Sequence, residues 1–117
     1  MYIQGFVVPV PHDKKDAYID LARFVGEIMR DYGALEIMEA WEADVKDGHT
    51  TDFRMAVKAQ EGEKIVFSWV IWPDKATCDS SHEKMMQDER MQGEFAMPFD
   101  GKRMILGGFD PVWTLGR

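Results

Sequence analysis

One short stretch of the chain places an imidazole, a carboxylate and a guanidinium close together. Asp52 follows His49 by three residues and Arg54 follows it by five, in a polar segment just after the turn dipeptide Asp47-Gly48. Such a group of side chains could transfer a proton or hold an organic acid. A polar loop with ordinary hydrogen bonds explains the same residues. His49, Asp52 and Arg54 are therefore candidate ligand-binding residues that need a fold to bring them together.

A second candidate lies near the end of the chain, where Lys102 and Arg103 directly precede an apolar run. The turn dipeptide Asp100-Gly101 comes before them, and Gly107-Gly108 interrupts the run. In one interpretation the cations are solvated charges at the entry of a strand, and the glycines form a β-bulge. In the other, Arg103 binds an anionic group, and the glycines let a ligand or a neighbouring backbone approach closely.

The remaining aromatic and reactive side chains have structural explanations as well as functional ones. Cys78 falls on an apolar helix face, where an inert buried thiol is the default. Trp41, Trp69 and Trp72 suit a core or a subunit interface, and the same rings would line a pocket if the interior were not filled. We keep Trp69 as a candidate ligand-binding residue. No motif indicates a metal site, we expect no cofactor, and no catalytic residue is assigned.

The overall composition limits the classes of partner. Fourteen Lys and Arg against 21 Asp and Glu give a net charge of −7, which repels nucleic-acid backbones and anionic membrane surfaces. The first apolar run is short and is broken by Pro9, unlike a signal peptide or a membrane span. A single cysteine excludes an internal disulfide. We expect a cytoplasmic protein of one domain, residues 1–117, with no nucleic-acid or membrane partner.

Apolar periodicity predicts the elements that must position these side chains. A stripe at helical spacing covers residues 18–32, after a candidate N-cap at Asp13 and before Gly33, which suits a left-handed C-terminal position. Residues 43–62 are ambiguous, because they alternate like a strand and could equally open a short helix capped by Thr51. We expect strands at residues 2–10, 34–42, 64–72 and 103–109, and helices at residues 13–32 and 74–88.

This order of elements is the ferredoxin-like βαββαβ pattern, an α+β fold with one four-stranded antiparallel sheet and both helices on one face. Residues 64–72 are apolar on both faces of their strand, since Phe67 and Trp69 alternate with Val66 and Val70. An antiparallel sheet with one wet face should instead alternate apolar and polar residues. We therefore expect a homodimer through the helix-free sheet face, with an interface above about 2,000 Å².

Four stretches of the chain carry a resemblance: MYIQGFVVPVPHDKKDAY, TDFRMAVKA, VFSWVIWP and MPFDGKRMILGGFDP. Together they resemble the YbaA-like family of bacterial proteins, domain of unknown function 1428, over nearly the whole chain. The resemblance implies a ferredoxin-like subunit of the dimeric α/β-barrel superfamily, in which two sheets pack face to face. It implies no reaction. Relatives on the same fold include cofactor-independent monooxygenases and haem-degrading enzymes, which is an analogy of fold alone.

Two functions of different class follow from these observations. The first is a small dimeric protein that binds a small apolar or weakly acidic molecule. The second is a cofactor-independent, monooxygenase-like enzyme that holds an aromatic substrate beside one proton-transferring group. Catalysis needs an enclosed cavity and a convergent titratable group. The sequence shows no such convergence, so the binding role ranks first and whether the protein is an enzyme stays open. The ligand-binding candidates are His49, Asp52, Arg54, Trp69 and Arg103.

Overall fold

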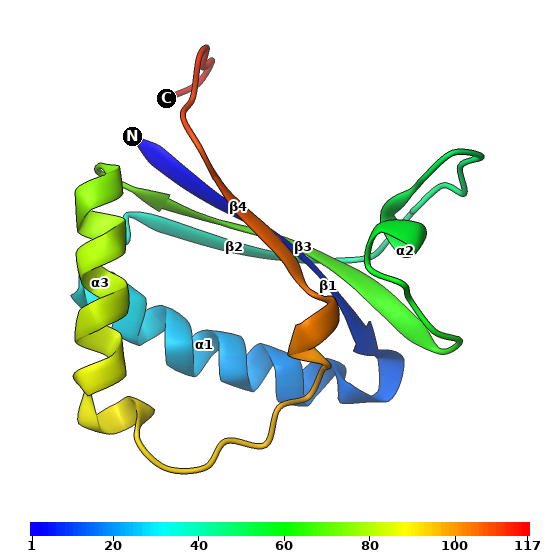
Figure 1. Cartoon of the computed structure of the whole chain (residues 1–117), viewed down its shortest axis with the longest axis horizontal. Helices are drawn as coiled ribbons and strands as arrows, with labels where there is room; N and C mark the ends of the chain where they lie inside the picture. The colour runs from blue at the N-terminus through cyan, green and yellow to red at the C-terminus, as the bar shows by residue number, and fades with distance from the viewer.

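The protein forms two layers, an antiparallel sheet and a layer of two long helices on one of its faces (Figure 1). A computed structural model describes residues 1–117. The strands are β1 (Tyr2–Pro11), β2 (Glu36–Trp41), β3 (Glu63–Trp72) and β4 (Ile105–Phe109), in the spatial order β2-β3-β1-β4. The helices are α1 (Lys15–Asp31), α2 (Phe53–Ala56) and α3 (Lys75–Gln87). The predicted βαββαβ order and four-stranded antiparallel sheet are confirmed.

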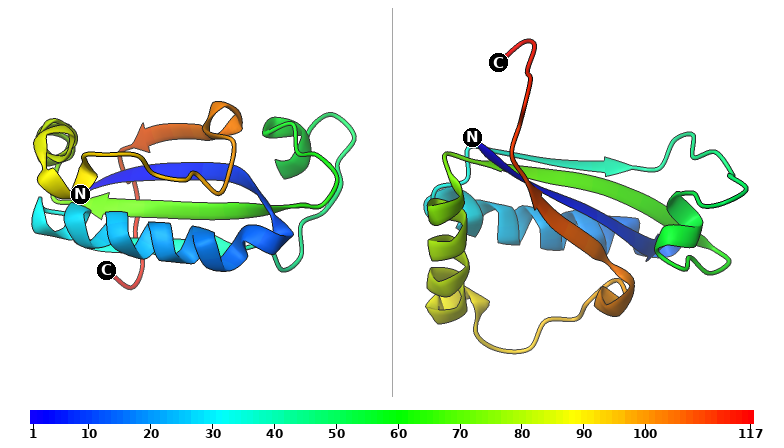
Figure 2. Two further views of the ribbon diagram at one scale, coloured as in Figure 1. Left: turned by 90° about the horizontal axis from the view of Figure 1, so that it is seen from below. Right: turned by 45° about the horizontal axis from the view of Figure 1, so that its top comes forward.

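The main core lies between the sheet and the two long helices, which sit on the same side of it (Figure 2). Trp72 is fully buried there, and its indole N–H donates to Gln4 Oε1 at 2.8 Å, so this polar group is satisfied. Cys78 is buried against the same cluster, and burial raises the pKa of its thiol. No helix combines the length and hydrophobicity that a membrane crossing requires.

The two ends of α1 differ in how well the sequence predicts them. The expected N-cap at Asp13 is wrong, because a 3-10 turn, His12–Lys14, comes first and α1 begins at Lys15 without a side-chain cap. Gly33 has the expected left-handed backbone, with φ of +115°. A Cβ atom at Gly33 would also lie 2.6 Å from Thr77 Cγ2 on α3, so this glycine lets the helices meet closely.

Residues 43–62 contain a short helix and no strand. The helix alternative is therefore correct, although its cap is Asp52 and not Thr51. The Asp52 carboxylate accepts hydrogen bonds from the backbone N–H groups of Met55, at 2.7 Å, and Gly48, at 2.9 Å. These bonds lower the pKa of Asp52 and fix the turn that begins α2.

Strand β4 joins the sheet without a bulge, contrary to one expectation for its glycine pair. Gly107 and Gly108 stand opposite Gly5 and Gln4 of β1 in continuous antiparallel register. The group that approaches Gly108 is a side chain and not the ligand or backbone expected, because a Cβ atom there would overlap the hydroxyl of Tyr2. The glycine pair therefore makes room for a neighbouring side chain.

The helix-free face of the sheet is apolar, as the two-sided strand pattern predicted. Phe67 is 44% exposed and Phe109 is 61% exposed, which is unusual for large apolar side chains at the middle and the edge of a sheet. The tail after β4 extends from this part of the molecule (Figure 1), and Arg117 near its end bonds to Glu36 of β2 at 2.6 Å. The helix-free face is formed by Ile3, Val7, Ile65, Phe67, Trp69, Ile71, Ile105 and Phe109.

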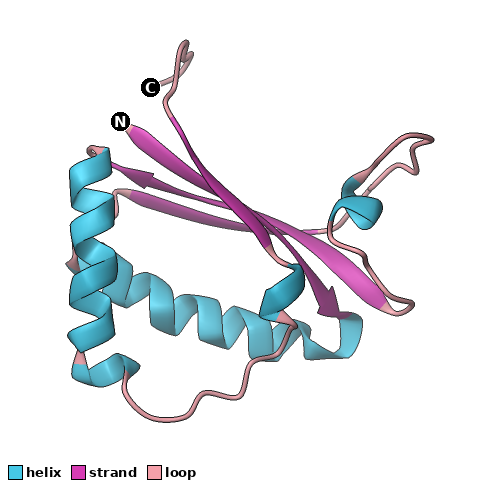
Figure 3. Ribbon diagram, viewed as in Figure 1, coloured by secondary structure: helices cyan, strands magenta, loops and turns pink.

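A long connection links α3 to β4 on the opposite, helix-bearing side of the sheet (Figure 3). It begins with a 3-10 turn, Glu89–Met91, and ends with another, Gly101–Arg103. We call residues 92–100 between these turns the lid segment. Its apolar side chains include Phe95, which packs against Phe24 of α1 with ring centroids 5.7 Å apart. The lid segment therefore covers part of the sheet that neither long helix reaches.

Candidate functional site

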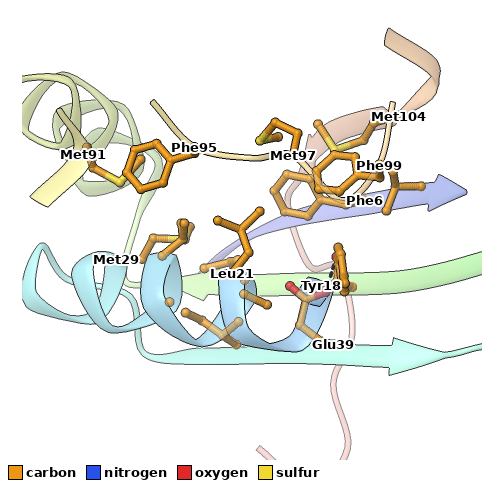
Figure 4. A pocket seen from close by; sticks show the side chains of 17 residues that line it. Phe6, Tyr18, Leu21, Met29, Glu39, Met91, Phe95, Met97, Phe99 and Met104 are labelled. Carbon is orange, nitrogen blue, oxygen red and sulfur yellow. Dashed lines mark hydrogen bonds between the residues drawn. The ribbon is translucent and has the colours of Figure 1, made fainter. Parts of the chain in front are cut away.

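A cavity of about 290 Å³ lies between α1, the helix-bearing face of the sheet and the lid segment (Figure 4). Met91, Phe95 and Met97 lie along one side of it, opposite Leu21 and Met29 of α1 (Figure 4). The lining is apolar with three exceptions. These exceptions are Tyr18, Glu39 and Ser68.

Three different elements bring these polar side chains together. Tyr18 lies in the first turn of α1, at the start of the apolar stripe, and is buried. Glu39 of β2 stands opposite Ser68 of β3 in the sheet register, so both point toward the helix layer. The Tyr18 hydroxyl donates a hydrogen bond to Glu39 Oε1 at 2.6 Å. The cavity therefore has one hydrogen-bonded acid–base pair on a mostly apolar wall.

The surroundings of this pair change its proton affinities. Burial raises the pKa of the Glu39 carboxyl, and hydrogen bonds from Tyr18 and Ser68 oppose this effect. Burial also raises the pKa of Tyr18, and the bond to Glu39 raises it further. Because Tyr18 keeps its proton so firmly, Glu39 is the proton acceptor of the pair.

Glu39 is reached from two sides. It belongs to an edge strand and is exposed on its outer side, although its carboxylate bonds to the buried Tyr18. A shallow groove between α1 and β2 shares four wall residues with the cavity. The shared residues are Ala22, Gly26, Ile37 and Glu39. Glu39 thus lies between an apolar interior and the solvent.

Glu39→Gln is expected to change the pH dependence of stability. Folding raises the pKa of Glu39 above its ordinary value of 4.5, so the folded state binds this proton more tightly than the unfolded chain. The resulting stabilisation is present at acidic pH and is lost as pH rises through the folded-state pKa. The glutamine variant should therefore gain free energy of unfolding relative to the wild type as pH rises from about 4.5 toward neutral.

Urea unfolding of both proteins across that range measures the difference. A difference that stays constant with pH, or that grows toward acid, would contradict the assignment of a raised pKa to Glu39. Glu83→Gln is a matched control, because Glu83 is exposed on α3 and lies outside the cavity lining.

The five residues that the sequence predicted do not line this cavity. His49 is exposed in the loop before α2, and Asp52 is the cap of that helix. Arg54 and Arg103 are brought together by Glu63, at the start of β3. Arg54 donates to the Glu63 carbonyl oxygen at 3.2 Å and pairs with the Glu42 carboxylate.

Arg103 is held by protein groups on every side of its guanidinium. It forms two bonds to the Glu63 carboxylate, at 2.6 and 2.7 Å, one to Asp100 at 3.1 Å and one to the Lys58 carbonyl at 3.0 Å. These bonds raise the pKa of Arg103 and lower that of Glu63. The interpretation of Arg103 as a solvated charge is therefore wrong, since its side chain is only 16% exposed.

Trp69 lies on the helix-free face, away from the cavity. Its indole N–H donates to Glu36 at 2.9 Å, and its ring meets Phe67 edge to face at 5.9 Å. A ligand role for Trp69 or for the four polar candidates stays a prediction. No set of three or more histidine, cysteine, aspartate or glutamate side chains is arranged to hold a metal ion.

Two signals in the sequence point to the residues that the prediction missed. Glu39 has the same strand parity as Ile37 and Trp41, so a charged residue stands among inward-facing apolar ones. The lid segment has large apolar side chains at alternate positions, as at Phe95 and Phe99, although it has no regular structure. Both features indicate side chains that face an interior space.

Known proteins resemble this chain at the level of sequence and of fold. Residues 1–101 match the family described as "Protein of unknown function (DUF1428)". The chain is 55% identical over 113 residues to "Uncharacterized protein YbaA" of Escherichia coli strain K12, covering 95% of this chain and 96% of that protein. The protein of the same name from Shigella flexneri matches equally well.

Solved structures share the architecture at low sequence identity. A crystal structure of an MhuD mutant with two manganese protoporphyrin IX molecules bound per active site matches with a TM-score of 0.67, 11% identity and full coverage of both chains. A NIPSNAP domain protein from Burkholderia xenovorans matches with a TM-score of 0.55, 12% identity and full coverage of both. The chain thus shares its fold with these two proteins. By its family match and its 55% identity to YbaA, the chain belongs to the DUF1428 family.

Proposed function

We propose that the protein binds one small, mostly apolar molecule in the cavity, through a ligand O–H or N–H that donates to Glu39. The observation that carries this proposal is the Tyr18–Glu39 pair on the wall of an apolar space. Besides the bonds from Tyr18 and Ser68, the carboxylate can accept a further hydrogen bond from a ligand, because its two oxygens offer about four acceptor positions. On the apolar cavity side of Glu39, little water competes for such a bond.

The size of the cavity indicates the class of ligand. At about 290 Å³ it is near the lower end of small-molecule sites, roughly 300–1,000 Å³. It is larger than the roughly 150 Å³ cavity that holds a benzene molecule. A neutral ligand with two fused rings fits this range. A weakly acidic phenol suits the site, whereas a carboxylate ligand would meet the Glu39 charge with no cation in the lining.

The lid segment forms one side of the cavity and would contact a bound ligand. Its two ends are held firmly. Before it, Arg90 bridges Asp88 and Asp31, and beyond it Arg103 bonds to Glu63. Gly93, within the lid segment, has a left-handed backbone with φ of +101° and no atom close to the position of a Cβ. The segment is thus anchored at both ends, and Phe95 and Phe99 pack against α1 between them.

Haem suits this cavity poorly. The porphyrin ligand in the MhuD structure belongs to that protein. Here the lining contains no histidine or cysteine to hold haem iron, and the lid segment closes the space to about 290 Å³. The proposed function therefore does not involve haem.

The test compares two ligands that differ by one hydroxyl group, 2-naphthol and naphthalene, by equilibrium dialysis. A hydrogen bond to a charged group contributes about 1.5–3 kcal/mol, so 2-naphthol should bind the wild type about tenfold more tightly or better. Glu39→Gln should lose most of that preference, and Glu83→Gln should keep it. Failure of both compounds to bind the wild type would refute the proposal.

We propose in addition that two copies associate through the helix-free face. Its exposed apolar side chains and the fold shared with dimeric α/β-barrel proteins support this arrangement. An apolar sheet face of this kind is stable in water when another surface covers it. The cavity lies on the opposite side of the sheet, so each subunit would keep its own ligand site.

The alternative function, a cofactor-independent monooxygenase-like enzyme, would use the same cavity. Its supporting observation is the position of the Glu39 carboxylate on the cavity wall, where a base would meet an aromatic hydroxyl. Consumption of dissolved oxygen in the presence of 2-naphthol would favour this alternative over simple binding. It ranks second because no feature of the lining indicates where oxygen would be held.

A further inference from the structure

We infer that Glu39 is the catalytic base of a keto–enol tautomerisation, in which a neutral, apolar ketone bound in the cavity exchanges a proton between its α-carbon and its oxygen. The inference rests on the proposed function, since it uses the same cavity. It adds a reaction and a substrate class to it. The substrate class is a small ketone with an acidic C–H next to the carbonyl and an otherwise apolar skeleton.

The side chains of the site are those that this reaction needs. Proton abstraction beside a carbonyl requires a base near the carbon and a hydrogen-bond donor near the oxygen. Glu39 supplies the base. The Tyr18 hydroxyl, which donates to Glu39 at 2.6 Å in the structure, has to turn its single hydrogen from the carboxylate to the substrate oxygen to serve as the donor. The apolar walls around them strengthen both interactions, because little water competes inside the cavity.

The step balances without any other reactant. The Glu39 carboxylate takes the α-proton, and the electrons of the broken C–H bond form a carbon–carbon double bond. The carbonyl π electrons move onto oxygen, which Tyr18 stabilises by its hydrogen bond, and the proton on Glu39 then passes to that oxygen. The reverse sequence returns the ketone. Tyr18 suits the donor role because burial raises its pKa, so it stays protonated throughout.

The position of Glu39 also predicts that the abstracted proton mixes with solvent. The cavity and the outer groove share Glu39 and Gly26 in their linings. Gly26 has no side chain, and a Cβ there would already lie 3.4 Å from Ile37 Cδ1. A protonated Glu39 can therefore exchange with water on its exposed side before it returns the proton. In heavy water the substrate should gain deuterium.

A nucleophilic reaction is less compatible with these residues. Ser68 is the only hydroxyl nucleophile of the lining besides Tyr18, and no histidine lies in the lining to activate it. Glu39 is the one ionisable carboxylate there. Proton transfer is thus the chemistry that the site can perform with its own groups.

The experiment uses 2-tetralone, a neutral bicyclic ketone, in heavy water. Loss of its α-proton signals is followed by NMR. General acid–base catalysis typically contributes about 10²-fold or more, so the wild type should accelerate exchange by about that factor over matched buffer. Glu39→Gln should fall to near the buffer rate, and Tyr18→Phe should slow exchange severalfold. Glu83→Gln is the control that should match the wild type.

Separate measurement of binding distinguishes the two proposals. If 2-tetralone binds and exchanges no faster than in buffer, or if Glu39→Gln exchanges as fast as the wild type, the tautomerase inference is refuted and the binding function stands. If neither 2-tetralone nor 2-naphthol binds, the proposed function itself falls. Should Glu39→Gln misfold, Glu39→Asp provides the second variant, because it keeps the carboxylate and withdraws it from the cavity. Its exchange should be slower than that of the wild type at equal occupancy, and an unchanged rate would refute the inference.

Discussion

Arg103→Ala is expected to lower the free energy of unfolding by about 2 kcal/mol. The variant loses charge-assisted hydrogen bonds, and a buried carboxylate stays behind without its charged partner. In the wild type, Arg103 forms two bonds to Glu63, whose side chain is only 7% exposed. The alanine variant leaves that carboxylate without its partner. It also releases Asp100, which Arg103 holds at the end of the lid segment.

Urea unfolding near neutral pH measures this loss, and Lys102→Ala is the control. Lys102 is the exposed neighbouring cation with no ion pair, so its loss should change stability by no more than about 0.5 kcal/mol. Arg103 lowers the pKa of Glu63 below its ordinary value of 4.5. The stabilisation is therefore present above that pH and is lost as pH falls through the folded-state pKa. Equal stability of Arg103→Ala and Lys102→Ala would show that the ion pair contributes little.

Phe67→Asp is expected to convert the proposed dimer into a monomer. Phe67 lies near the centre of the helix-free face and packs against Trp69 and Phe53, both in edge-to-face geometry. A carboxylate there would be buried without a partner in a face-to-face dimer, which costs several kcal/mol. In the monomer it would meet water, because Phe67 is already 44% exposed. The cost of burying the carboxylate therefore destabilises the dimer and not the folded monomer.

Light scattering at micromolar concentration gives the mass of each protein. One chain is 13.5 kDa, so the wild type should measure twice 13.5 kDa and Phe67→Asp should measure 13.5 kDa. Met86→Asp is a matched control, since Met86 is 78% exposed on α3, on the opposite side of the sheet. A wild type that measures 13.5 kDa would refute the dimer, and a Phe67→Asp protein that stays dimeric would place the interface elsewhere.

The fold could be predicted because the spacing of apolar residues along the chain follows directly from which side of each element is buried. The helical stripe of residues 18–32 marks the side of α1 that faces the sheet, as the structure shows. The two-sided strand at residues 64–72 agrees with an apolar helix-free face, and the partner that would cover this face stays a prediction. Helix ends are harder, because neighbouring residues compete for the same role. Asp52 and Thr51 can both cap a helix, and only the backbone geometry around Gly48 selects Asp52.

The site was less predictable because its parts are far apart in the sequence. Arg103 meets Glu63 across forty residues, and a local pattern carries no signal for such a partner. The Tyr18–Glu39 pair joins a helix to an edge strand in the same way. Proximity in sequence instead favoured His49 and Asp52, and the structure assigns Asp52 to the cap of α2.

The methionines of the cavity lining have a consequence for selectivity. Met29, Met91, Met97 and Met104 contribute to its walls, and their unbranched thioether side chains adapt to differently shaped neighbours. Walls of this kind discriminate weakly between ligands of similar size. Discrimination then falls to the Tyr18–Glu39 pair, which recognises one polar group at one place. We expect the cavity to bind several related ring systems. Their affinities should depend strongly on the position of the polar group and weakly on the shape of the ring system.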